Sequence, residues 1–162
     1  ASYENVDAVC LDGEGLEDST MRCTNEEYQL LSSGELQDER VKVAVPMAGR
    51  VREMWFGEQG YKSVQAPVLF VSGTEDGQEG NQNHYESISD IDFRWLSVAG
   101  GCHQSFATGA CDTLEMQLGF DIQNTYILAF ARWNLLGDNN DSIEQLLNGE
   151  QSPFTEATLL VK

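Results

Sequence analysis

Three short, mostly apolar segments constrain the fold of this sequence more than any other feature. They cover residues 41–48, 67–72 and 93–99. The first is apolar at every position except Lys42, so it needs cover on both of its faces. Strands have such cover in a parallel sheet that is packed between helices. We therefore expect these segments to be neighbouring strands of a helix-covered sheet.

Helical patterns lie between and after these strands. They cover residues around 81–88 and residues 116–136 and 141–147, and a shorter one covers 26–31. Gly137 is placed to end the long helix, because glycine readily adopts the left-handed conformation found at helix ends, and Asp141 is placed to cap the short one. Strands that alternate with helices in this order predict an α/β fold with right-handed crossovers.

The sequence divides into three parts without a low-complexity linker. Residues 1–40 are irregular and contain two cysteines, residues 41–149 hold the predicted strands and helices, and residues 150–162 are a C-terminal tail. A doubly wound, mostly parallel sheet of only three strands leaves a buried apolar strand with an open edge. We therefore expect the three strands to belong to a larger sheet that another polypeptide completes.

The chain is strongly acidic, which limits the partners that it can bind. It has 27 acidic and 9 basic residues, for a net charge of −18. Such a surface repels nucleic acids, anionic membranes and polyanionic substrates. No apolar stretch approaches the length of a membrane span. We expect the charge to serve solubility, in a salty habitat for example, and a specific cationic partner is the alternative.

The four cysteines are Cys10, Cys23, Cys102 and Cys111. Without a C-x-x-C motif, and with only two histidines, they do not form a familiar zinc-binding set. Their spacing favours the pairs Cys10–Cys23 and Cys102–Cys111 among the three connectivities that four cysteines allow. Two disulfides indicate a secreted or periplasmic protein, and a start at Ala1 is what a mature chain without its leader would show.

A carboxylate and a histidine follow two neighbouring strands. Asp76 lies in the loop after residues 67–72, and His103 follows residues 93–99. An imidazole can accept and return a proton near neutral pH, and a carboxylate can fix its tautomer, so this pair is a candidate acid and base. Glu75 and Asp90 are weaker alternatives to Asp76. His84 lies in a polar stretch, and we expect it to be exposed.

Three motifs in order resemble the C-terminal half of the α/β-hydrolase superfamily, and most closely secreted dienelactone-hydrolase-like, platelet-activating-factor-acetylhydrolase-like and cutinase-like esterases. They are residues 40–48, residues 66–76 and residues 99–106. The resemblance implies that the three strands are the last of an eight-stranded sheet and that Asp76 and His103 are the acid and base of a catalytic triad. The family's nucleophile lies in a G-x-S-x-G turn, which this sequence lacks.

The resemblance therefore implies a serine hydrolase whose nucleophile lies on a separate N-terminal chain, cut from the same precursor. Such an enzyme would hydrolyse neutral carboxylic esters or polyesters through an acyl-enzyme, without a cofactor, and Trp55 and Phe56 would line its substrate pocket. Two alternatives stay open: a catalytically silent binding protein of this fold, and an enzyme with a cysteine or aspartate nucleophile. Cys102 beside His103 could be a nucleophile, but adjacent side chains on an extended loop point apart.

Overall fold

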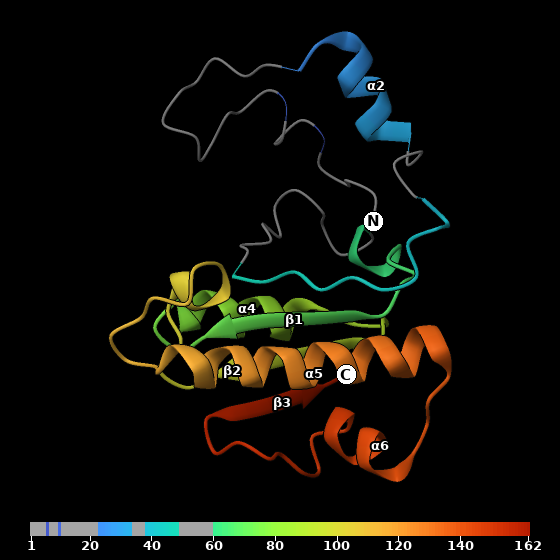
Figure 1. Cartoon of the computed structure of the whole chain (residues 1–162). Coiled ribbons are helices and arrows are strands. Elements are labelled where there is room, and N and C mark those ends of the chain that lie inside the picture. Colours follow the sequence, from blue (N-terminus) through green and yellow to red (C-terminus); the bar gives the residue numbers. More distant parts are fainter. Residues whose placement is uncertain (1–5, 7–9, 11–22, 34–37, 49–59) are drawn as a thin grey trace.

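The computed structural model describes Val6, Cys10 and residues 23–33, 38–48 and 60–162 (Figure 1). In chain order, the helices and strands are α2 (Asn25–Ser33), β1 (Val68–Gly73), α4 (Gln78–Ser87), β2 (Phe93–Val98), the 3₁₀ helix η1 (His103–Phe106), α5 (Met116–Leu136), α6 (Asp141–Leu147) and β3 (Ala157–Val161). None of the helices in these ranges is long and apolar enough to cross a membrane.

The sheet has the order β1-β2-β3 and is mixed. β1 and β2 are parallel, with Val68 opposite Phe93 and Gly73 opposite Val98. β3 is antiparallel to β2 and pairs Val98 with Ala157. The predicted α/β character is confirmed at this level. β1 and β2 are parallel as predicted, and the strand β3, which was not predicted, makes the three-stranded sheet mixed. The helix α4 connects β1 to β2, as expected for a parallel crossover.

The C-terminal tail predicted for residues 150–162 contains the strand β3. Ala157 and Leu159 are buried while Thr158 is exposed, which is the alternation of a strand with one face on the core. The outer edge of β3 is partly covered, because Tyr85 donates its hydroxyl to the Val161 carbonyl and Gly149 lies against the Leu159 carbonyl. β2 was expected to be the last strand of the chain, and β3 instead lies beside it.

The first predicted strand, residues 41–48, lies on the other side of β1 but pairs with it through only two bridges. Ala44 accepts from the Leu69 amide and donates to the Pro67 carbonyl. Pro46 accepts from the Val71 amide, and the Ala48 amide donates to the Val71 carbonyl. This segment therefore extends the parallel part of the sheet by a short, partly regular fourth member, drawn in cyan in Figure 1.

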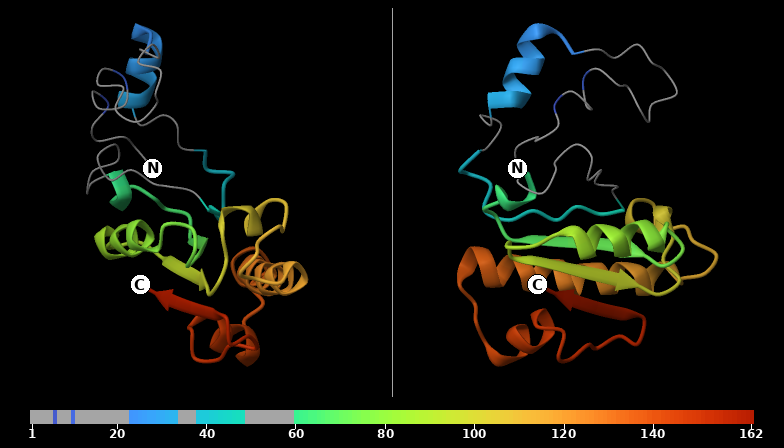
Figure 2. Two further views of the ribbon diagram at one scale, coloured as in Figure 1. Left: turned by 90° about the vertical axis from the view of Figure 1, so that its left-hand side faces the viewer. Right: turned by 180° about the vertical axis from the view of Figure 1, so that it is seen from behind.

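Helices cover both faces of the sheet (Figure 2). One face packs against α5 and α6, around Leu69, Val71, Leu96 and Val98. The other face packs against α4 and the turn at residues 60–64, and its core residues are Tyr61, Val68, Phe70, Ile88, Phe93 and Trp95. All six residues of β1 are buried. Cover on both faces is the reason why the strands show little polar alternation.

The limits of the two C-terminal helices follow from their capping residues. The Glu115 carboxylate accepts hydrogen bonds from the amides of Gln117 and Leu118, and these bonds hold the pKa of Glu115 below its ordinary value. Gly137 ends α5 in the left-handed conformation, as predicted, with φ of 66°. The cap of α6 is Asn140 and not Asp141, because the Asn140 side chain accepts from the Ile143 amide.

Lys162, which directly follows β3, links this strand to α4 through hydrogen bonds. The Lys162 ammonium donates to the carbonyls of Tyr85, Glu86 and Ile88, at the end of α4. We expect Lys162→Met to lower the free energy of unfolding by about 1–2 kcal/mol, since three carbonyls at a helix C-terminus lose a cationic donor. Urea unfolding would measure the change, with Lys42→Met as the control for loss of a positive charge. An equal effect of the two substitutions would contradict this prediction.

Candidate functional site

The structure brings Asp76 and His103 together. Asp76 lies three residues beyond β1, and His103 is the first residue of η1, which follows β2. The Asp76 Oδ2 atom lies 3.3 Å from Nδ1 of His103. The carboxylate is partly buried, with 21% of the side chain exposed, whereas 64% of the histidine side chain is exposed. The pair therefore forms an anchored acid and a ring that is open to a partner.

Two glycines allow the loops that carry this pair to approach each other. A Cβ atom on Gly73 would lie 1.9 Å from the Gly101 carbonyl oxygen, so only glycine fits at position 73. The Glu75 amide donates to the same carbonyl at 2.9 Å, and the Gly100 amide donates to Oγ1 of Thr74 at 2.9 Å. The close backbone contact fixes the distance between the acid loop and the histidine loop.

The main chain of Asp76 is held at both of its polar groups. Its amide donates to the Gly73 carbonyl at 3.1 Å. Its carbonyl accepts from Nδ2 of Asn81, a side chain on α4 with only 6% of its residue surface exposed. The start of α4 therefore sets the position of the acid, and the side-chain carboxylate stays available for His103.

The turn that carries His103 is anchored to the core. Ser105 is buried, and its Oγ accepts from the Cys102 amide at 3.1 Å. Phe106 packs into the core beside α5. The buried Gln123 on α5 donates from Nε2 to the Ser105 carbonyl at 2.9 Å. We did not predict Gln123 or Ser105 as supporting residues. The only sequence signal was a polar Gln123 on the apolar face of a long helix.

Both predicted disulfides, Cys10–Cys23 and Cys102–Cys111, are present. All four cysteines are thus paired, which is compatible with a secreted protein. The bridge at Cys102 leaves no thiol beside His103, so Cys102 is not a nucleophile in this state. The bridge spans the η1 turn and joins its start to the loop before α5.

We expect the double substitution Cys102→Ser and Cys111→Ser to destabilise the chain without displacing His103. Opening a loop of this length costs about 2–3 kcal/mol in the chain-entropy model. The turn would stay in place because Ser105, Phe106 and Gln123 also hold it. Denaturant unfolding would measure the loss, and the NMR signals of the His103 ring would report its contact with Asp76. Loss of that contact in the folded variant would contradict the prediction.

The other candidates lie elsewhere or outside the described residues. The Glu75 carboxylate accepts from the Thr74 hydroxyl, and no described contact joins it to His103. Asp90 precedes β2, at the opposite end of the sheet from His103, and pairs with Lys62. Trp55 and Phe56, the predicted substrate-binding residues, fall outside the described ranges. Asp76 is therefore the acid that the described structure supports.

The expectation that His84 is exposed is wrong. Only 6% of this residue is exposed, and its Nδ1 lies 3.3 Å from the Tyr61 hydroxyl. The ring packs against Phe70 and Phe93. The helical spacing of Asn81, His84 and Ile88 was the signal that could have placed it on the buried face of α4. His84 belongs to the α4 side of the sheet and lies apart from the Asp76–His103 pair.

The arrangement can hold and transfer one proton. With Nδ1 bonded to Asp76, a neutral His103 ring presents Nε2 as its acceptor. Within the described ranges, Nε2 has no hydrogen-bond partner. The site thus has an acid and a base, whereas the described residues place no nucleophile beside them.

Comparison with known proteins gives no family for this chain. Neither a protein-family model nor a curated protein sequence matches it.

Proposed function

We propose that this chain supplies the acid and base of a secreted serine hydrolase that acts on neutral carboxylic esters. The nucleophilic serine would lie on a second polypeptide, the N-terminal fragment of the same precursor. The observation that carries the proposal is the contact between Asp76 and His103 beyond the C-terminal ends of two parallel strands. The order of acid and histidine along the chain is that of α/β-hydrolases, which the sequence motifs also resemble.

The proton transfers follow from this geometry. Nε2 of His103 takes the proton of the serine hydroxyl as its oxygen attacks the ester carbonyl, and returns that proton to the alcohol as the ester C–O bond breaks. Water then attacks the acyl-enzyme and gives its proton to Nε2, which returns it to the serine as the carboxylic acid leaves. Asp76 accepts from Nδ1–H throughout, orients the ring and stabilises its cationic form.

The exposure of His103 and the charge of the chain limit which second polypeptide and which substrate can complete the site. The exposed His103 ring needs the second polypeptide as a cover, because a protein environment that excludes water strengthens the stabilisation of charge in the transition state. The net charge of −18 disfavours anionic esters. Trp55 and Phe56 remain the proposed apolar contacts for the substrate. This reaction requires no cofactor.

The test is to coexpress this chain with the polypeptide encoded upstream of Ala1 and to assay hydrolysis of p-nitrophenyl butyrate. A fluorophosphonate probe should add its mass to a serine of the second polypeptide, and the labelling should require His103. Intact-mass spectrometry would identify the labelled chain.

Three outcomes would replace the proposal. A labelled cysteine, or an alkylated aspartate with a haloalkane substrate, would show the same fold with another nucleophile. A tight complex of the two polypeptides without hydrolysis or labelling would indicate a silent binding protein. A stable, compact 18 kDa monomer that never associates with the upstream polypeptide would remove the basis for a shared site.

A further inference from the structure

The segment of residues 43–47 has a backbone edge without partners in the described structure. The hydrogen bonds to β1 use main-chain groups of Ala44, Pro46 and Ala48. Because backbone groups alternate in direction along a strand, the N–H and C=O groups of Val43, Val45 and Met47 point away from β1. None of these groups bonds to a residue that the structure describes. An extended chain beside this edge could bond to them.

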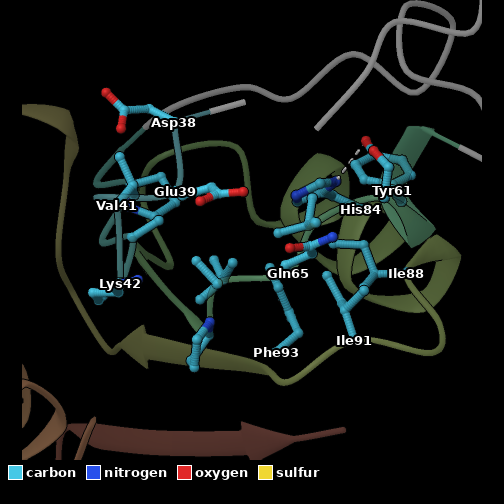
Figure 3. A pocket seen from close by; sticks show the side chains of 17 residues that line it. Asp38, Glu39, Val41, Lys42, Tyr61, Gln65, His84, Ile88, Ile91 and Phe93 are labelled. Carbon is cyan, nitrogen blue, oxygen red and sulfur yellow. Dashed lines mark hydrogen bonds between the residues drawn. The ribbon is translucent and has the colours of Figure 1, made fainter. Parts of the chain in front are cut away.

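An apolar groove lies next to this edge, on the face of the sheet that carries α4. It encloses about 750 Å³. Figure 3 shows Glu39, Val41 and Lys42 on one side and Tyr61, His84 and Ile88 on the other. The rest of the lining is mainly apolar and includes Ala44, Pro46, Val64, Val68, Ile91 and Phe93. The groove thus lies beside the edge, since Ala44 and Pro46, which line the groove, alternate along the segment with Val43, Val45 and Met47.

The opposite face of the same segment already packs on the core. Val43, Val45 and Ala48 contact the cluster between the sheet and α5. Met47 and Val41 remain 42% and 54% exposed. A strand bound beside residues 43–47 would therefore lie next to a packed layer on one face of the sheet and next to an open apolar groove on the other face.

We propose that an extended segment of the second polypeptide binds along residues 43–47 as a parallel strand and places apolar side chains in the groove. The identity of the partner rests on the proposed function, whereas the binding mode rests on the edge and the groove. A small molecule could fill the groove but could not bond to alternating N–H and C=O groups along a strand. An extended peptide segment can do both, because its backbone can bond to the edge while its side chains enter the groove.

The parallel direction follows from the position of the acid and the base. Asp76 and His103 lie beyond the C-terminal ends of β1 and β2, while the groove reaches Val68 and Phe93 at their starts. The two ends of β1 are about 17 Å apart at the usual rise per residue. Only a parallel strand would carry the residues that follow it toward the end where His103 lies.

Charge favours a neutral or basic partner over a second copy of this chain. Figure 3 shows the Glu39 carboxylate turned toward the groove. A second copy would bring another net charge of −18 to this face, and like charges at a contact disfavour association. A segment that alternates apolar residues with lysine or arginine has the complementary chemistry.

Amide hydrogen exchange at single-residue resolution would test the proposal, with this chain alone and with the polypeptide encoded upstream of Ala1. Exchange at Val43, Val45 and Met47 should slow at least about tenfold in the complex. The amides of Ala44 and Ala48, which already bond to β1, are the internal reference. Complex formation, shown by native mass spectrometry, without slower exchange at the edge would overturn this docking mode while leaving the shared active site intact. Failure of the polypeptides to associate would overturn both.

A pair of substitutions at Val45 separates the backbone contact from the side chain. Val45→Pro removes an outward N–H that β1 does not use, and Val45→Ala shortens the side chain but keeps that N–H. We expect Val45→Pro to weaken binding of the upstream polypeptide at least about tenfold and Val45→Ala to weaken it by less than about threefold. Unchanged exchange at Ala44 and Ala48 would show that the sheet is intact. Equal binding of both variants, or edge protection that appears only when this chain alone is concentrated, would overturn the proposal.

Discussion

Replacement of His103 by Ala is expected to lower the kcat of ester hydrolysis by the assembled protein by about 10⁴-fold or more. The expectation rests on the proposed function, in which the contact between Nδ1 and Asp76 leaves Nε2 as the base for the nucleophile. Loss of one triad member leaves only the catalysis that the oxyanion hole and substrate binding provide. Stopped-flow or steady-state assays with p-nitrophenyl butyrate would measure the loss. Asp76→Asn should also be severe, because an amide can hold the wrong tautomer of the ring.

The matched controls for this experiment are Gln104→Ala and His84→Ala. Gln104 is the exposed neighbour of His103 on η1, so its replacement should change kcat by less than about twofold. His84 is buried against Phe70 and Phe93 and also lines the groove, so its loss should lower stability and association, while the fraction that is folded and assembled keeps its kcat. An essential His84 together with a dispensable His103 would refute the assignment of the base.

Replacement of Gly73 by Ala is expected to lower the free energy of unfolding by about 3 kcal/mol or more. The added Cβ would lie 1.9 Å from the Gly101 carbonyl oxygen, so the backbone of one loop has to move. That movement would also separate Asp76 from His103, because the contact between Gly73 and Gly101 sets the spacing of the two loops. Urea unfolding would measure the stability, and the fluorophosphonate reaction of the assembled protein would report the site.

Gly80→Ala is the control for this substitution. Gly80 lies within α4, and apart from its chain neighbours and the backbone of that helix, no atom comes within 4 Å of a Cβ atom built there. Alanine is favoured over glycine inside a helix by about 1 kcal/mol, so this variant should be as stable as the parent chain or more stable. If Gly73→Ala were tolerated as well as Gly80→Ala, the described contact between the two loops would be wrong.

Elements with a strong local pattern could be predicted from the sequence. The long helix α5 and its end at Gly137 follow from periodicity and a glycine stop, and β1 and β2 follow from apolar runs. β3 was missed because its five residues follow a polar turn, and its stability depends on pairing with β2, more than fifty residues earlier. Such long-range pairing leaves little local signal.

In the candidate site too, some features could be predicted from the local sequence, whereas others depend on long-range packing. The order of Asp76 and His103 after successive strands predicted that they would meet, because the C-terminal ends of parallel strands lie at one edge of the sheet. The burial of His84 and the hydrogen bond from Gln123 to Ser105 depend on how helices pack on the sheet. For His84 and Gln123 the sequence holds only a weak signal, which is their helical spacing with buried neighbours.

The cover on the outer edge of β3 has a consequence for stoichiometry. The Tyr85 hydroxyl occupies the Val161 carbonyl, and Gly149 lies against the Leu159 carbonyl, so this border is a poor template for another strand. The described sheet is therefore open to growth at one border only, along residues 43–47. A molecule with one unpaired sheet edge can add one partner and then has no further edge to offer. A molecule with two unpaired edges could assemble end to end into open-ended fibres. If the proposed second polypeptide binds along residues 43–47, we expect this chain to take up only one copy of it, even in concentrated solution.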